Sequence, residues 1–129
     1  MDIIFIIKLV TVLGIFNVWM LRYNKSTKYR GGKAKNLQEE FKTYGLNKWT
    51  MYIIGSIKIG ISILFIVSSL MNDTLILKDS IDFYGAATMS IIMVGAIIMH
   101  IKVNDPFKKS MPAITMLTMY SIIFMSYLL

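Results

Sequence analysis

The chain contains no cysteine, and its 129 residues include a single histidine, His100. The absence of thiols excludes disulfide bonds, thiol redox chemistry, thiolate zinc sites and a cysteine nucleophile. One histidine cannot form a metal site alone, and no nucleophile, base and orienting group can be assembled into a catalytic trio. Phosphate-loop, dinucleotide-binding, zinc-protease and hydrolase motifs are also missing. The sequence therefore predicts no catalytic residues and no metal site, and whether the chain is an enzyme stays open.

Acidic residues are scarce, with seven Asp and Glu against fourteen Lys and Arg, which gives a net charge of +7. Eight of the basic residues lie in one segment, 22–48. A basic segment beside an apolar stretch is typical of a cytoplasmic loop at a membrane surface, and no nucleic-acid-binding motif accompanies it. We therefore expect anionic lipid headgroups, and no nucleic acid, as partners of this loop.

Apolar residues make up 56% of the chain, and mean hydropathy is +0.62. They gather into four stretches of about 18–21 residues, the length that an α-helix needs to cross roughly 30 Å of hydrocarbon. The stretches are about 3–21, 50–70, 83–101 and 112–129. The sequence thus predicts an all-α fold, a four-helix transmembrane bundle in a single membrane domain 1–129, with the lipid bilayer as its surroundings.

The loops between these stretches predict an orientation. The first loop, 22–49, and the third loop, 102–111, are basic, whereas the second, 71–82, has more acidic than basic residues. Basic loops stay in the cytoplasm, so both termini are predicted to face outward. Trp19, Tyr23, Trp49 and Tyr52 flank the first loop and are predicted to form an aromatic belt at the inner surface, with packing in the core as the alternative.

A short helix is predicted inside the first loop. Asn36 can cap a helix from Leu37 to about Tyr44, and Gly45 ends it. Leu37, Phe41 and Tyr44 share one stripe of this helix, so we expect a short interfacial amphipathic helix on the inner surface.

Three ionisable residues interrupt the apolar stretches, and such residues are candidates for function. Lys8 lies near the outer end of the first stretch, so its amine is expected to reach the surface or to pair with Asp2 or an outer-loop aspartate. Lys58 lies roughly 12 Å deep and shares a stripe with Gly55 and Ser62, so it should face other helices. His100 ends the third stretch, where it acts either as a proton carrier or as an ordinary hydrogen-bonding residue.

A candidate ligand site follows from this distribution. Lys58, His100, Glu40 and Asp105 are all predicted to lie on or near the inner side. In a crevice, Lys58 could bind an anionic headgroup, a quinone carbonyl or a carboxylate. The alternative is that these groups are solvated or paired with neighbouring lysines.

Several segments together resemble one family. They are V18-W19, the stretch YRGGKAKNLQEEFKTYGLNKW from Tyr29 to Trp49, IGSIKI from Ile54, and GAIIMHIKVNDPFKKSMPA from Gly95 to Ala113. In these segments the chain is similar to the DoxX-like proteins, small bacterial four-helix membrane proteins, over nearly its whole length. The resemblance implies a four-helix bundle in the bacterial inner membrane. Some relatives are linked to thiosulfate:quinone oxidoreduction, which makes a quinone a possible cofactor. Many such proteins have an acidic residue where this chain has Lys58.

Two functions remain open from the sequence. The first is a non-catalytic accessory or structural subunit of a membrane assembly, with other membrane subunits or further copies of the chain as partners. The alternative is a quinone- or lipid-binding membrane protein, a class that includes redox-linked subunits, with its site at Lys58 and His100.

Overall fold

The regular structure is helical throughout the residues that the computed structural model describes, 3–25, 27–72 and 76–128. The long helices are α1 (Ile3–Phe16), α3 (Lys48–Ser69), α4 (Ile76–Lys102) and α5 (Met111–Leu128). A π-helical turn, η1 (Asn17–Leu21), continues α1 without a break. Two short elements, α2 (Leu37–Thr43) and the 3-10 helix η2 (Phe107–Ser110), lie in the connections.

The long helices are suited to a membrane by length and composition. Four segments of the described chain are candidate spans, with mean hydropathy between 1.4 and 2.3. No more than 28% of the residues in any span are buried inside the chain, so most apolar side chains face outward. Outward-facing apolar helices need lipid around them. The predicted all-α four-helix transmembrane bundle is confirmed, and the chain is a multi-pass membrane protein.

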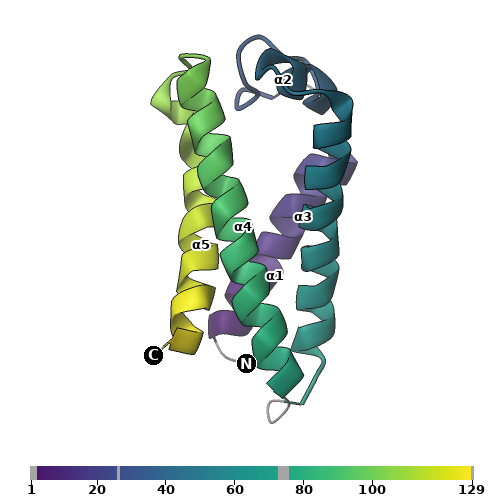
Figure 1. Cartoon of the computed structure of the whole chain (residues 1–129), viewed down its shortest axis with the longest axis vertical. Coiled ribbons are helices and arrows are strands. Elements are labelled where there is room, and N and C mark those ends of the chain that lie inside the picture. Colours follow the sequence, from purple (N-terminus) through teal and green to yellow (C-terminus); the bar gives the residue numbers. More distant parts are fainter. Residues whose placement is uncertain (1–2, 26, 73–75, 129) are drawn as a thin grey trace.

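The four helices form a ring in which each packs mainly on two neighbours: α1 packs on α3 and α5, and α4 packs on α3 and α5. Figure 1 shows both termini at one end of the bundle, which we call the terminal end. The segment 22–47, which includes α2, and the segment 103–110 lie at the opposite end, which we call the loop end (Figure 1). Helix α3 returns the chain to the terminal end, and α4 leads it back to the loop end (Figure 1).

The third long helix is longer than hydropathy predicted. Helix α4 begins at Ile76, whereas the predicted apolar stretch began at residue 83. Lys78, Asp79 and Asp82 lower the hydropathy of the first two turns, yet these residues are helical. Asp82 therefore lies inside a helix and not in the second loop. Residues 73–75 of that loop, and Leu129 at the end of the fourth stretch, lie outside the described residues.

The short helix in the first loop forms as predicted. The Asn36 side chain accepts a hydrogen bond from the Glu39 N–H at 2.8 Å, which caps the first turn of α2. Leu37, Phe41 and Tyr44 are buried on one stripe. The chain then turns away at Gly45, whose φ of +81° suits a residue without a side chain.

A buried polar cluster joins the four long helices at the terminal end. Lys8 Nζ of α1 lies 3.0 and 3.1 Å from the two carboxylate oxygens of Asp82 in α4. The Ser68 hydroxyl of α3 and the Tyr127 hydroxyl of α5 each donate to Asp82 at 2.6 Å. Lys8 is only 2% exposed and Asp82 is fully buried.

This cluster corrects the prediction that Lys8 reaches the surface. The Lys8 amine turns inward because Asp82, placed inside α4, offers a buried carboxylate at the same height. The expected pairing with an aspartate is therefore found, but within the bundle. Asp2, the other partner considered, lies outside the described residues.

Candidate functional site

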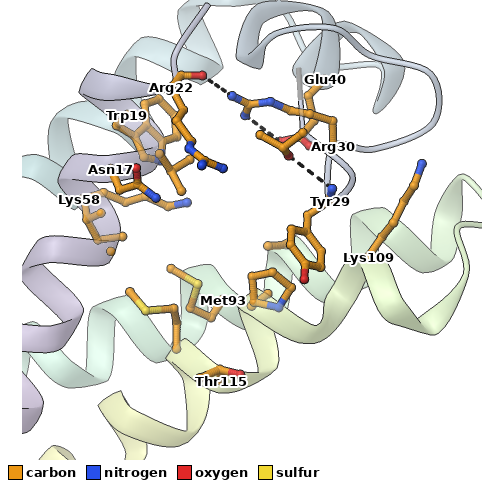
Figure 2. Close-up of a pocket in the computed structure, with 18 of the residues that line it drawn as sticks. Asn17, Trp19, Arg22, Tyr29, Arg30, Glu40, Lys58, Met93, Lys109 and Thr115 are labelled. Carbon is orange, nitrogen blue, oxygen red and sulfur yellow. Dashed lines mark hydrogen bonds and ion pairs between the residues drawn. The ribbon is translucent and has the colours of Figure 1, made fainter. Parts of the chain in front are cut away.

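A cavity of about 450 Å³ lies in the loop-end half of the bundle. It is enclosed by the last turns of α1 with η1, by α4, α5 and one residue of α3, and by α2 and the loop before it (Figure 2). The residues that line it are Gly14, Ile15, Asn17, Val18, Trp19, Arg22, Thr27, Tyr29, Arg30, Glu40, Lys58, Met93, Ala96, His100, Lys109, Pro112, Ala113, Thr115 and Met116.

The wall nearer the middle of the bundle is apolar, and it is open on one side. A Cβ at Gly14 would lie 3.4 Å from the Met116 sulfur, so α1 and α5 approach closely at this level. Toward the loop end, Val18 of η1, one turn after Gly14, and Thr115 of α5, next to Met116, line the cavity and are also exposed. The cavity therefore opens between α1 and α5, toward the side of the bundle that faces lipid.

Trp19 forms the floor beside Lys58. Its indole packs on Gly55 of α3, where a Cβ would lie 2.5 Å from the ring. The ring of Phe41 meets it edge-on, with centroids 5.8 Å apart. Trp19 is 8% exposed, whereas Trp49 is 67% exposed. Trp19 is thus a core residue and not part of a surface belt, because the π-helical turn and Gly55 let the indole fit between α1 and α3.

Lys58 projects from α3 toward the cavity. Gly55 and Ser62, which share its stripe, are buried, so the prediction that Lys58 faces other helices is confirmed. Lys58 Nζ lies 5.1 Å from the Trp19 ring centroid, a cation–π distance. In the described part of the chain, Lys58 forms no ion pair.

Glu40 of α2 holds the loop over the cavity. Its Oε2 accepts a hydrogen bond from the Gly31 N–H at 2.6 Å, and its Oε1 lies 3.8 Å from Arg30 Nη1. Arg30 is itself 4% exposed and donates to the Arg22 carbonyl oxygen at 2.5 Å. Burial raises the pKa of Glu40, although the Gly31 N–H and the nearby Arg30 act in the opposite direction.

His100 and Asp105 form a second contact between the loop and the helices. His100 Nδ1 lies 2.7 Å from Asp105 Oδ2, and Asp105 Oδ1 accepts from the Gly32 N–H at 3.0 Å. Burial acts to raise the pKa of Asp105, but the hydrogen bonds from His100 and Gly32 and the charge of Lys109 outweigh it and hold this pKa below its usual value. On its other side, His100 Nε2 lies 3.4 Å from the Tyr44 hydroxyl.

The four residues predicted as a ligand site come together in part. Glu40, Lys58 and His100 line the same cavity, although they come from three different helices. Asp105 does not line the cavity; it lies behind His100 and holds that ring. The sequence interpretation thus placed these residues near one another, and their role in binding remains a proposal.

Sequence reasoning missed the other charged residues of the cavity. Arg22, Arg30 and Lys109 also line it. Together with Lys58 they make four cations around one carboxylate, Glu40. The available signal was the group of basic residues in segment 22–48. It indicated a loop at a membrane surface, but not that the loop folds back over the ends of the helices.

The cavity combines cationic and apolar walls. No group of three His, Asp or Glu residues that could hold a metal ion occurs in residues 3–25, 27–72 and 76–128. The cavity instead offers cationic donors at one end and aliphatic and methionine side chains at the other. Such a surface complements a molecule with a polar head and an apolar body.

Comparison with known proteins places the chain in a family. A family model described as the DoxX-like family matches residues 11–122, which is most of the chain and includes every residue that lines the cavity. Neither the curated proteins nor the solved structures include a match.

Proposed function

Because the chain belongs to the DoxX-like family of membrane proteins, and because its cavity opens to the side of the bundle, we propose that it binds an amphipathic membrane molecule, a lipid or a quinone. The observation that carries this proposal is the pairing of cationic and apolar walls in one laterally open cavity. A ligand would enter between α1 and α5 from the bilayer, with its head toward Lys58 and His100 and its apolar body along Ile15 and Met116.

The same proposal includes an orientation. With the basic loop 22–49 in the cytoplasm, the cavity lies at the depth of the inner leaflet of the bacterial inner membrane, and both termini lie outside. The basic side chains of this loop that point away from the cavity, such as Lys33 and Lys42, then contact anionic headgroups.

The experiment that tests this function compares two phenylalanine substitutions on α4. Ala96→Phe fills the cavity, whereas Thr88→Phe adds the same ring on the exposed face of the same helix. Each protein is purified in mild detergent, and the bound small molecules are identified by native mass spectrometry. We expect the native chain and Thr88→Phe to retain a lipid or quinone at fixed stoichiometry and Ala96→Phe to lose it. Equal retention by all three proteins would contradict the proposal.

A non-catalytic accessory subunit is the second candidate, and one face of α3 favours it. Ser56 is exposed, and four residues later Gly60 has no heavy atom of the described chain within 4 Å of where a Cβ would lie. Small residues four apart allow another helix to approach closely. Within the chain this face is unused, which suits another membrane subunit or a second copy.

The accessory role predicts that native mass spectrometry detects bound protein subunits. Gly60→Leu should reduce the population of complexes with other proteins or of homo-oligomers, because the added side chain blocks close approach. It should leave the monomer folded, because the side chain meets open space. A chain that is monomeric and without protein partners before the substitution would count against this role.

A further inference from the structure

The cations of the cavity are not equivalent, because two of them already have partners. Arg30 contacts Glu40 and donates to the carbonyl oxygens of Arg22 and Lys25. Lys109 Nζ lies 3.6 Å from Asp105 and donates to the Gly32 carbonyl oxygen at 2.5 Å. The charge of each is therefore met by a carboxylate within the chain.

Lys58 and Arg22 are the cations that remain. Within the described residues neither forms an ion pair, and the Lys58 amine rests against the Trp19 ring. Figure 2 shows Lys58 and Arg22 on one wall of the cavity, with Asn17 between them. Two positive groups and a side-chain amide thus face one space, and the carboxylate that lines it, Glu40, is already engaged by Arg30 and by the Gly31 N–H.

The physical cost of this arrangement indicates the missing partner. Lys58 lies within a transmembrane helix, where a cation is expensive unless it is paired, whereas Arg22 follows η1 and is exposed at the loop end. A quinone carbonyl would accept a hydrogen bond from Lys58 but would leave both charges in place. A phosphate would compensate them and would also accept the several N–H groups of a guanidinium.

We propose that the head of the ligand is a phosphate ester with a net negative charge, held by Lys58 and Arg22 with Asn17. A zwitterionic head would bring its own ammonium group beside these two cations, so the ligand is an anionic phospholipid. This inference rests on the proposed function and narrows its ligand class. A lipid is favoured over a free phosphate ion because Ile15, Met93 and Met116 form an apolar wall beside the cations. The acyl chains of a lipid would cover this wall, whereas a phosphate ion would not.

The test uses delipidated protein in a neutral detergent. Four probes are titrated: short-chain phosphatidylglycerol, short-chain phosphatidylcholine, a short-chain ubiquinone analogue and inorganic phosphate. Thermal unfolding reports binding, because a ligand that binds only the folded state raises the melting temperature. We expect phosphatidylglycerol to raise the melting temperature most. It should bind at least about tenfold more tightly than phosphatidylcholine, because its head has no ammonium group to oppose Lys58 and Arg22.

The variants separate the site from general surface charge. Lys58→Met and Arg22→Gln should each weaken phosphatidylglycerol binding at least about tenfold. Lys58→Arg should retain it, and Lys42→Gln, which removes an exposed cation of α2 outside the cavity, should not change it. Because Lys58→Arg keeps the charge at the same position, it keeps the proposal testable even if Lys58→Met fails to fold.

The outcomes distinguish this inference from the function on which it rests. Binding of the quinone analogue alone, unchanged by Lys58→Met, would overturn the phosphate head and leave an amphipathic ligand site. Binding of inorganic phosphate as tight as that of phosphatidylglycerol would overturn the lipid source. If no probe binds to any of the folded proteins, both proposals fail.

Discussion

At the scale of single residues, two glycines of α3 have opposite surroundings. A Cβ at Gly55 would lie 2.5 Å from the Trp19 ring, whereas a Cβ at Gly60 would meet nothing within 4 Å. We expect Gly55→Ala to displace the indole and to cost roughly 1–3 kcal/mol of stability, because a packed interior resists added volume. Gly60→Ala should be neutral or stabilise the helix by less than about 1 kcal/mol.

Fluorescence can report these two substitutions directly. In a Trp49→Phe background the emission comes from Trp19 alone, and Trp49 is exposed enough to be replaced without disturbing the core. Gly55→Ala should shift the emission maximum and lower the unfolding temperature. An unchanged spectrum for Gly55→Ala would mean that the indole does not rest on this glycine.

The ion pair between Lys8 and Asp82 gives a second prediction at this scale. Asp82→Asn leaves the Lys8 charge buried without its counter-ion, and breaking a buried pair in this way costs about 3–5 kcal/mol. The double variant Lys8→Met with Asp82→Leu removes both charges and should recover a large part of that loss. Thermal unfolding in detergent measures both effects. A double variant no more stable than Asp82→Asn would show that the charges themselves contribute little.

At the scale of elements, the loop before α2 is held to the connection between α4 and α5 through Asp105. A carboxyl whose pKa is lower in the folded state stabilises the fold above its unfolded pKa of about 3.9, and that stability is lost as pH falls through the folded value. We expect Asp105→Asn to cost roughly 1–3 kcal/mol at pH 5, as for a hydrogen bond to a charged group. The cost should shrink below about pH 4.

The matched control for this element is Glu40→Gln. Burial raises the pKa of Glu40, so the folded state favours its protonated form and loses stability as pH rises above the unfolded value near 4.3. The loss of unfolding free energy caused by Glu40→Gln should therefore be smaller at neutral pH than at low pH. For Asp105→Asn the order is reversed. Unfolding curves between pH 3 and 7 for both variants decide this. Parallel pH profiles would contradict the two assigned directions.

The elements were largely predictable because hydropathy and capping are local signals. The apolar stretch beginning at Thr50 and the cap at Asn36 each mark an element within a few residues of its position in the structure. The start of α4 was not predictable in this way, because its polar first turns are stabilised by Lys8, a partner on another helix. The π-helical turn at Asn17–Leu21 leaves no signal in composition either.

At the scale of the whole molecule, the predicted orientation can be tested with the absence of cysteine as an advantage. Lys33→Cys in the loop before α2 and Asn72→Cys after α3 each introduce a single thiol at an exposed position. In intact cells a membrane-impermeant maleimide should label Asn72→Cys and should reach Lys33→Cys only after the membrane is opened. The reverse pattern would invert the orientation and place the cavity in the outer leaflet.

The cavity itself depends on how the whole ring of helices assembles. The sequence indicated that Lys58 faces inward and that Glu40, His100 and Asp105 lie at the same end. It did not indicate that α1 and α5 approach at Gly14 and leave an opening beyond it, because that separation depends on two helices distant in sequence. Arg30 reaches the cavity only because the loop folds back over it, whereas Arg22 directly follows η1 (Figure 2).

The most direct measurement is a crystal structure of the native chain grown from a lipid mesophase that contains phosphatidylglycerol. We predict elongated density between α1 and α5, with its head within hydrogen-bonding distance of Lys58 Nζ and its apolar body beside Met116. A cavity closed by approach of α1 to α5, or one that holds only water beside Lys58, would contradict the proposal that this protein binds an amphipathic membrane molecule.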